Sequence, residues 1–338
     1  MIKNFKLKIK NSKVLIISGP TATGKTGVAI KLAQKYNGEL ISADSRQIYK
    51  GMDIGTGKDL NKNSIFNFQF SINNQNVGFY LIDKTPVWLL DIINPNQSFS
   101  VAQYRQLALK AIDDIISRGK LPTIVGGTGQ YIESIINPQD TFNIKPNYFL
   151  RLFLNRLPVR LLQLTLRLLD IKTFRLLNNS DVNNRRRLVR KIEIKIYSLF
   201  HYKLIKNYKF KIKNFEILHI SLTDTINNII SKIDTRIQSR LDLGLIDEIK
   251  NLLIKYKWTD PGLNTLAYYD FKPCLVRTHH DAFLQSCIDN WSIHEHQYAR
   301  RQKTWFKKFT PNHFIDISKP NSYKQIDSIV SKWYNKRI

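Results

Sequence analysis

The sequence predicts an α/β fold in which a largely parallel sheet carries helices on both faces. Short apolar runs alternate with helical patterns through the first third of the chain, which is the order that strand–helix–strand units produce. A glycine-rich turn directly follows the first apolar run, and the total length of 338 residues is ample for a large buried core.

The expected elements follow from the spacing of apolar residues. Strands are predicted at residues 14–18, 40–42, 87–92 and 122–125, and helices at residues 28–35 and 101–118. Apolar and polar residues alternate on either side of residues 73–76, which predicts a β-hairpin over about residues 64–83. We expect this hairpin to be peripheral to the sheet.

The rest of the chain predicts a helical insertion and a return to the core. Residues 1–142 form the first part of the core, residues 143–182 a small Leu/Arg-rich helical insertion domain, and residues 183–338 the core completion with C-terminal helices. The expected elements are helices at 181–200, 226–242, 246–255 and 292–309 and a strand at 215–221.

The chain is strongly basic, with 53 Lys and Arg against 26 Asp and Glu, a net charge of +27. Such a field attracts polyanions and makes their binding depend on salt. The two cysteines, Cys274 and Cys287, predict a reducing compartment without a disulfide framework. No apolar run reaches membrane-spanning length, and we expect a cytoplasmic protein that does not contact membranes.

The glycine-rich turn has the spacing G-x4-G-K-T between a predicted strand and a predicted helix, the pattern of a P-loop. Backbone N–H groups of such a loop converge on an anion at the positive end of the following helix. Lys25 adds a positive charge, and the Thr26 hydroxyl can hold Mg²⁺. The predicted diphosphate-binding residues are Gly19, Pro20, Thr21, Ala22, Thr23, Gly24, Lys25 and Thr26.

Asp44 follows the second predicted strand, so we expect it at the same rim of the sheet as the phosphate loop. A carboxylate there can accept a proton from a nucleophile or hold Mg²⁺ through water. The alternative is a helix N-cap for the turn that starts at Ser45.

The chain is similar to the tRNA dimethylallyltransferase (tRNA isopentenyltransferase) family in five blocks that appear in the family's order: residues 19–26, 44–49, 51–58, 126–131 and 297–307. The resemblance implies transfer of a dimethylallyl group from dimethylallyl diphosphate to N6 of the adenosine 3′-adjacent to the anticodon in tRNA. It also implies a P-loop NTPase-like core and Mg²⁺ as cofactor.

The resemblance implies roles for individual residues. Asp44 matches the general base, Thr128 a threonine near the reacting groups, and Lys25 and Lys232 the diphosphate ligands. The residues that match tRNA-contacting positions, some of them loosely, are Asp44, Ser45, Arg46, Gln47, Arg151, Arg186, Arg187 and Arg190; a basic stripe with Arg300 and Lys303 is added from the last predicted helix. Arginine stems that cover leucine faces are the alternative for many of the insertion arginines.

Four positions depart from the family pattern, and the first is Arg186, which stands where the family has glutamine. Lys232 and His296 each stand where the family has arginine, and Ala267 stands where it has glycine. Lysine keeps the charge of arginine but cannot bind in a bidentate manner. These changes affect substrate affinity more than the type of reaction.

Three other functions fit parts of the sequence. An adenylate isopentenyltransferase shares the donor site but acts on a free nucleotide, and a P-loop nucleotide kinase shares the phosphate loop alone. A non-catalytic RNA-binding module would not need Lys25, Thr26, Asp44 and Thr128 together. The high positive charge favours a polyanionic acceptor. We expect a monomer.

Overall fold

The structure is a computed structural model that describes residues 12–60, 64–137, 141, 144–200, 215–276, 280–308 and 313–336. The chain divides into two compact units, one formed by residues 1–136 with 214–338 and the other by residues 137–213. None of the helices in the described ranges combines the length and apolar character that a membrane-spanning segment needs.

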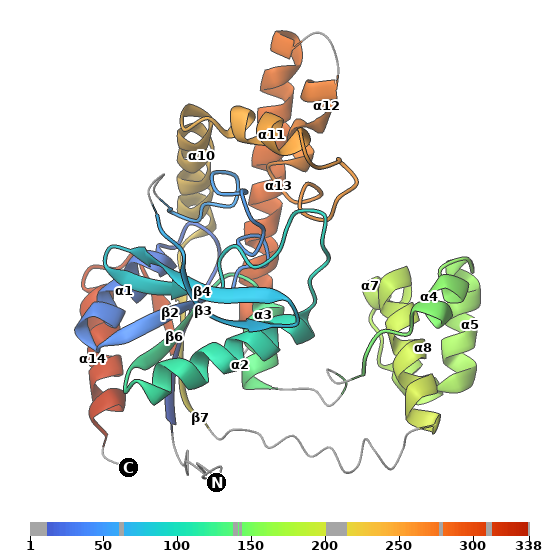
Figure 1. Cartoon of the computed structure of the whole chain (residues 1–338), viewed down its shortest axis with the longest axis horizontal. Coiled ribbons are helices and arrows are strands. Elements are labelled where there is room, and N and C mark those ends of the chain that lie inside the picture. The colour runs from blue at the N-terminus through green and yellow to red at the C-terminus, as the bar shows by residue number, and fades with distance from the viewer. Residues whose placement is uncertain are drawn as a thin grey trace. The chain divides into compact units, whose positions relative to one another are not determined.

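The larger unit, which we call the core unit, is built on one eight-stranded sheet (Figure 1). Its strands, in spatial order, are β3 (Asn67–Ile72), β4 (Gln75–Ile82), β5 (Thr85–Trp88), β2 (Gly38–Ser42), β6 (Leu121–Gly126), β1 (Ser12–Ser18), β7 (Phe215–Thr223) and β8 (His313–Asp316). All neighbours from β5 to β8 are parallel, whereas β3, β4 and β5 pair antiparallel.

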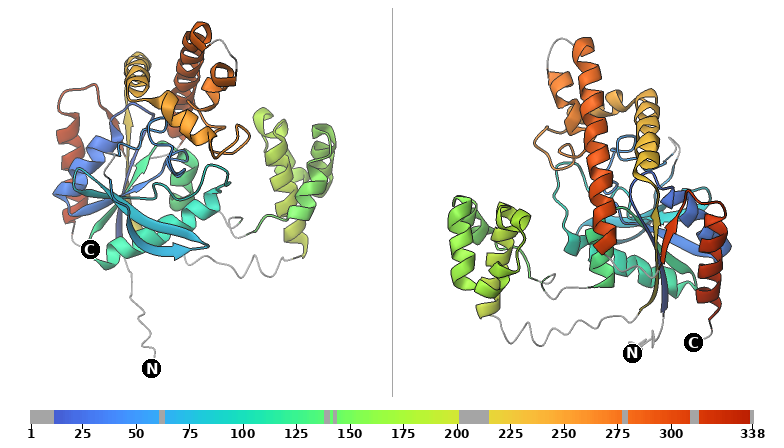
Figure 2. Two further views of the ribbon diagram at one scale, coloured as in Figure 1. Left: turned by 45° about the horizontal axis from the view of Figure 1, so that its top comes forward. Right: turned by 180° about the vertical axis from the view of Figure 1, so that it is seen from behind.

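Helices cover both faces of this sheet (Figure 2). On one face, α1 (Lys25–Lys35) and α14 (Ser322–Asn335) bury Leu32 and Val330 against the strands. On the other face, α2 (Val101–Ser117) and α3 (Gly129–Ile136) bury Leu107 and Ile132. The predicted fold class is therefore confirmed.

A second group of helices belongs to the core unit but stands beyond the carboxyl ends of the strands (Figure 1). It consists of α10 (Ile226–Asp242), α11 (Leu245–Leu253), a 3₁₀ turn (Tyr269–Phe271), α12 (Lys272–Val276) and the long α13 (His280–Lys308). Here α10 and α13 pack against each other, and buried Ile233 and Trp291 belong to the same core as α2 and α3. These helices wall the rim where ligands bind in open α/β sheets.

The smaller unit is helical, and its boundary differs from the prediction. It contains α4 (Tyr148–Leu154), α5 (Val159–Leu169), α6 (Ile171–Arg175), α7 (Asn179–Val182) and α8 (Arg185–Phe200). Because α8 buries Leu188 and Ile192 against Leu162 and Leu166 of α5, it belongs here and not to the core completion that we placed at residues 183–338. The helix predicted over 181–200 is also broken, between α7 and α8.

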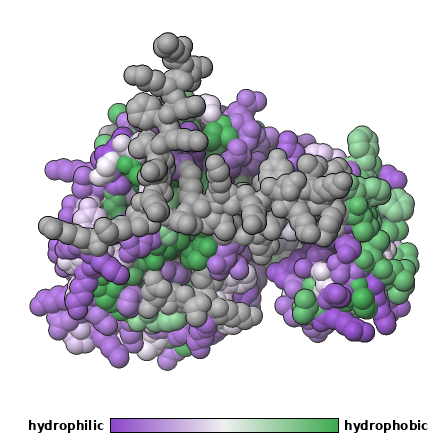
Figure 3. All heavy atoms as spheres, turned by 90° about the horizontal axis from the view of Figure 1, so that it is seen from below, coloured by the Kyte–Doolittle hydropathy of each residue, from purple (hydrophilic) through white to green (hydrophobic). Residues whose placement is uncertain are grey.

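The helical unit exposes many large apolar side chains, and hydrophobic residues appear green on its surface in Figure 3. Along α4, α5 and the segment that follows they are Tyr148, Phe149, Leu152, Phe153, Leu161, Leu164, Leu168 and Leu176. Residues 147–200 also contain twelve Lys and Arg against three Asp and Glu. Its surface is therefore both apolar and basic.

Two other expectations need correction. The strand predicted over 87–92 ends at Trp88, because Leu89 and Asp91 adopt positive φ angles of 64° and 56° that an extended strand does not allow. The predicted hairpin is formed by β3 and β4 and lies at one edge of the sheet, but it is part of the sheet and not an addition to it. Through the pairing of β4 with β5 it continues the central sheet.

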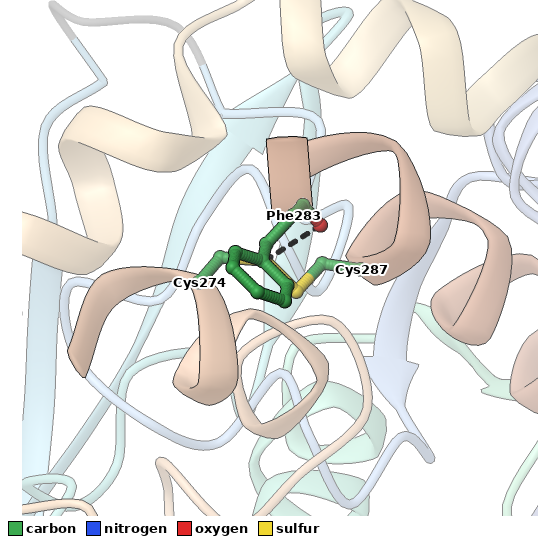
Figure 4. Close-up of a disulfide and its surroundings, with 3 residues drawn as sticks. All are labelled: Cys274, Phe283 and Cys287. Atoms are coloured by element: carbon green, nitrogen blue, oxygen red, sulfur yellow. Dashed lines mark hydrogen bonds between the residues drawn. A yellow bond between two sulfur atoms is a disulfide. The ribbon is translucent and has the colours of Figure 1, made fainter. Parts of the chain in front are cut away.

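The cysteine prediction was wrong, because Cys274 and Cys287 form a disulfide (Figure 4). Their Cα atoms lie 6.6 Å apart, because α12 and α13 pack against each other. The Cys274 sulfur also lies 3.1 Å from the carbonyl oxygen of Phe283. The sequence spacing alone did not reveal that these two helices are in contact.

Candidate functional site

A cavity of about 560 Å³ lies at the carboxyl ends of the central strands. It lies entirely within the core unit, and its wall brings together six predicted site residues from separate segments: Lys25, Thr26, Asp44, Arg46, Gln47 and Lys232. Thr21, Ala22 and Gly24 line it as well. The predicted rim is therefore present, with the phosphate loop and Asp44 on one cavity.

The phosphate loop is held by its own contacts. The Thr23 hydroxyl donates to the Pro20 carbonyl oxygen at 2.8 Å, and Lys25 Nζ donates to the same oxygen at 2.5 Å. Gly24 precedes α1 with a positive φ of 69°, a conformation that glycine adopts without strain. A Cβ atom at Gly19 would collide with the backbone of Leu222, so the loop can pass β7 only with glycine there.

The electrostatic surroundings of Lys25 favour an anion. Desolvation by the surrounding protein and the positive charge of Arg236 lower the pKa of the Lys25 ammonium to about 7, although the Asp44 carboxylate opposes the shift. A bound diphosphate would add negative charge beside this group and favour its charged form. The site therefore gains complementarity when an anion arrives.

Asp44 and Thr128 are linked across the ends of β2 and β6. Asp44 Oδ1 accepts the backbone N–H of Arg46 at 2.9 Å, so this carboxylate fixes the turn that follows it, although the predicted alternative of a helix N-cap does not apply because no helix starts at this point of the described chain. The Thr128 hydroxyl accepts the N–H of Ser45 at 3.0 Å, and the Thr128 N–H donates to the Ala43 carbonyl at the same distance. No hydrogen-bond partner of Asp44 Oδ2 is recorded among the described residues, so fixing the turn leaves one carboxylate oxygen available.

The long helix α13 closes one side of the cavity with residues that we did not predict as a site. Glu295 accepts a hydrogen bond from Arg46 Nη1 at 3.0 Å, and the Arg46 guanidinium lies 4.2 Å from the centre of the Tyr298 ring. Burial alone would raise the pKa of Glu295, but Arg46 and Arg240 outweigh it and hold that pKa low. Gln302 completes this face.

A basic face of α10, which packs against α13, forms another part of the wall. Lys232 Nζ pairs with Asp224 at 2.7 Å, Arg236 donates to the Thr21 hydroxyl at 3.1 Å, and Arg240 donates to the Gly55 carbonyl at 3.1 Å. Burial and then Arg236 lower the pKa of the Arg240 guanidinium to about 10.

The residue spacing shows that the residues of each wall share one face of a helix, but it does not show that these faces line a cavity. Lys232, Arg236 and Arg240 recur every four residues, which places them on one face of a helix. Glu295, Tyr298 and Gln302 are spaced by three and four residues on α13 and share a face in the same way.

The loop between β2 and β3 is fixed by one carboxylate. Glu248 accepts three backbone N–H groups, of Asp53, Ile54 and Gly55, at 2.8–3.1 Å. The Tyr268 hydroxyl donates to the same carboxylate at 2.6 Å. This loop carries Gly57 and Lys58 into the cavity wall, so Glu248 and Tyr268 shape the site from outside it.

Two of the family departures have visible consequences. Ala267 adopts a φ of 74°, in the left-handed region that favours the glycine of the family pattern. His296 Nε2 lies 2.7 Å from Asp234 Oδ1, so this histidine has an acidic neighbour on α10.

Several residues predicted to contact tRNA have partners within the protein. In the helical unit, Arg151 and Arg190 both bind the buried Glu193, at 2.7 and 2.6 Å. Arg187 pairs with Asp181, whereas Arg186 is exposed and no partner of its side chain is recorded in the described parts of the chain. Arg151 and Arg190 thus have an acidic partner inside the helical unit, and their contact with tRNA stays a prediction.

The remaining predicted contacts belong to the core unit. Gln47 bridges Ser42 and Gly57, with its amide oxygen 2.9 Å from the Ser42 hydroxyl and its amide nitrogen 2.8 Å from the Gly57 carbonyl oxygen. Lys303 donates to the carbonyl of Asp224 at 2.9 Å, while Arg300 is exposed. Of the two stripe residues predicted to contact tRNA, Arg300 is thus exposed to solvent and Lys303 is half-buried.

The cavity suits Mg²⁺ that is bound together with a phosphate ligand. Thr26 offers a hydroxyl at the start of α1, as the predicted metal ligand. No cluster of three or more His, Cys, Asp or Glu side chains able to hold a metal occurs among the described residues. Mg²⁺ commonly keeps several waters and takes further ligands from phosphate oxygens, and its binding at Thr26 stays a prediction.

Two family models and several known proteins match this chain. A family model described as IPP transferase matches residues 47–309, and one described as isopentenyl transferase matches residues 12–66. The tRNA dimethylallyltransferase of Roseiflexus sp. (strain RS-1) is 32% identical over 95% of this chain and 98% of its own length. That of Staphylococcus haemolyticus (strain JCSC1435) is 33% identical over 96% and 92%.

A solved structure is similar across nearly the whole chain. The full-length tRNA isopentenylpyrophosphate transferase from Bacillus halodurans superposes with a TM-score of 0.64 at 29% identity. The match covers 95% of this chain and 96% of that one.

Proposed function

The chain belongs to the IPP transferase family, and from this membership and the cavity we propose that it is a tRNA dimethylallyltransferase. The enzyme transfers the dimethylallyl group of dimethylallyl diphosphate to N6 of the adenosine 3′-adjacent to the anticodon. The observation that carries the proposal is the meeting of Lys25, Asp44 and Arg236 on one cavity. Anion ligands and a carboxylate with a free oxygen are the two functions that this transfer requires.

The proposed reaction replaces a carbon–oxygen bond by a carbon–nitrogen bond. The bond between C1 of the dimethylallyl group and the diphosphate oxygen breaks, and its electron pair leaves with the diphosphate. The lone pair of N6 forms the new bond to C1, and the Asp44 carboxylate accepts the proton that N6 loses. The products are tRNA with N6-dimethylallyladenosine, diphosphate and a proton.

The phosphate loop and α10 are proposed to hold the leaving group. Backbone N–H groups of residues 19–26 and the positive end of α1 suit a diphosphate, and Lys25 and Arg236 add charge. Lys232 contributes from the same wall, although its pairing with Asp224 limits its reach. Mg²⁺ held by Thr26 would supply further stabilisation of the negative charge that develops on the leaving oxygen.

The acceptor side of the site is proposed to involve Thr128 and the segment from Ser45 to Gln47. The Thr128 hydroxyl and Ser45 fix the turn that presents Asp44, and Arg46 with Tyr298 offers a flat, charged surface on which a base can stack. Exposed basic residues, among them Arg186 and Arg300, suit the tRNA backbone. We also propose that the enzyme is monomeric and cytoplasmic.

The choice of acceptor tests the proposal against the adenylate isopentenyltransferase alternative. Purified protein is incubated with dimethylallyl diphosphate and Mg²⁺ and either unmodified tRNA or AMP, and the nucleosides are analysed by mass spectrometry. We expect N6-dimethylallyladenosine from tRNA and little or none from AMP. Modified AMP with unmodified tRNA would favour the alternative, and phosphate transfer from ATP to AMP would indicate a kinase.

A further inference from the structure

Gln302 joins the two halves of the cavity. Its Oε1 accepts the backbone N–H of Thr21 in the phosphate loop at 2.8 Å, and its Nε2 donates to the carbonyl oxygen of Gly127 at 2.9 Å. Only 6% of the residue is exposed, so both bonds are shielded from water. One planar amide on α13 therefore connects the end of β1 to the end of β6.

The two ends of this bridge lead to the two reacting groups. Thr21 lies in the loop that surrounds the diphosphate site, whereas Gly127 directly precedes Thr128, whose hydroxyl accepts the N–H of Ser45 beside Asp44. The chain of contacts thus runs from the donor loop through Gln302 to the turn of the general base. A Cβ atom at Gly127 would overlap Gln302 Nε2, so the bridge also needs glycine there.

We propose that Gln302 is a positioning residue that sets the separation between the donor diphosphate and the acceptor turn, an inference that rests on the proposed function. The phosphate loop has internal contacts of its own, from Thr23 and Lys25 to Pro20, which do not involve Gln302. Loss of the bridge therefore leaves a loop that still binds diphosphate but is no longer fixed relative to Asp44. Misplacement of reacting groups by about 1 Å is enough to slow a reaction roughly 100-fold.

The test uses Gln302→Met, which keeps the length of the side chain and removes both hydrogen bonds. We expect the single-turnover rate of tRNA prenylation at saturating donor to fall by about 10- to 100-fold. The dissociation constant for inorganic pyrophosphate should stay within about threefold of wild type, a difference well under the tenfold that corresponds to ~1.4 kcal/mol. Gln285→Met, on an exposed part of α13, is the matched control and should match wild type in both measurements.

A second variant changes Gly127, the residue whose carbonyl oxygen Gln302 binds. Gly127→Ala displaces the amide of Gln302, so it should slow the reaction in the same way. The two substitutions should be non-additive when combined, because both remove the same contact. This comparison keeps the proposal testable even if Gln302→Met folds poorly, which a thermal melt would reveal.

Three results would overturn the inference. They are a rate near wild type for Gln302→Met, a rate loss that the change in pyrophosphate affinity fully explains, or full additivity with Gly127→Ala. A wild-type enzyme that leaves tRNA unmodified would reject the proposed function itself. This result would be obtained with the wild-type enzyme alone, so it is distinguished from a failure of the inference about Gln302.

Discussion

The two oxygens of the Asp44 carboxylate have different surroundings. Oδ1 accepts the N–H of Arg46 and fixes the turn, while Oδ2 has no recorded partner in the described chain. One residue can therefore both fix the turn and act as the base. A carboxamide at this position keeps an oxygen for the turn but cannot accept a proton as a base does.

Asp44→Asn should consequently lower the rate of prenyl transfer by about 10²- to 10⁴-fold with little change in tRNA or pyrophosphate affinity. The rate is measured in a single turnover, and the affinities by equilibrium binding. Asp242→Asn, an exposed carboxylate on α10, serves as control. Turnover of Asp44→Asn at the wild-type rate would reject the assignment of the base.

The lowered pKa of Lys25 predicts a pH dependence of donor binding. In the free enzyme the ammonium loses its proton as pH rises through about 7, so the charge that attracts diphosphate is fully present below this value and declines above it. Donor affinity should fall with pH by up to about tenfold per unit until the pKa of Lys25 in the complex is reached.

Lys25→Met isolates this effect, because ionisation of the donor itself is the same for both proteins. The ratio of the dissociation constants of variant and wild type should be roughly 10- to 100-fold at low pH and shrink as pH rises above about 7. Binding is followed by calorimetry. A ratio that does not vary with pH would show that the charge of Lys25 does not govern donor affinity.

At the scale of elements, the sequence predicted best those helices, strands and loops that local residue patterns determine. The phosphate loop, α1, α2, β6, β7 and α10 appear close to their predicted positions, because a glycine-rich turn or a regular apolar period marks each of them. The strand predicted over 87–92 was too long, since the positive φ angles at Leu89 and Asp91 are imposed by the surrounding fold. The disulfide and the assignment of α8 depend on contacts that local periodicity does not encode.

The residues of the candidate site also divide into those that local sequence patterns located and those that they did not. Lys25 and Asp44 could be placed on one rim because both follow parallel strands. Glu295 and Gln302 could not be placed there from the sequence. They lie on α13, far along the chain, and only the tertiary fold brings this helix to the rim. The partners of Arg151 and Arg190 were also hidden, since Glu193 gives no sequence signal of its burial.

The loop over residues 51–58 offers a prediction at this scale. Glu248→Ala removes the acceptor of three backbone N–H groups and of the Tyr268 hydroxyl, so the free energy of unfolding should fall by at least about 2 kcal/mol. Urea denaturation measures this loss. Asp247→Ala, the exposed neighbour on α11, should change stability little, and equal losses for both variants would contradict the role of Glu248.

At the scale of the whole molecule, charge supports the choice of a polyanionic acceptor. Residues 147–200 contain twelve basic and three acidic residues. Each of the three carboxylates pairs with Lys or Arg inside the helical unit. The basic groups without such partners are therefore available to a nucleic acid. Arg186 is the exposed member of the predicted arginine tract with no recorded partner in the described chain.

Arg186→Gln should reduce the slope of log tRNA affinity against log salt by about 0.7 to 0.9, the value for one lost phosphate contact. The slope is measured by filter binding over a series of salt concentrations. Arg175→Gln removes the same charge from an exposed site outside the tract and should leave the slope unchanged. Equal slopes for Arg186→Gln and wild type would exclude a phosphate contact there.

The central claim is that one cavity holds a diphosphate donor and delivers its prenyl group to a single adenosine of tRNA. The most direct measurement is the stoichiometry of pyrophosphate released to N6-dimethylallyladenosine formed, with the modified nucleotide located by mass analysis of nuclease fragments. The account predicts equal amounts, with all modification at the adenosine 3′-adjacent to the anticodon. Pyrophosphate release without modified adenosine, or modification spread over other adenosines, would contradict it.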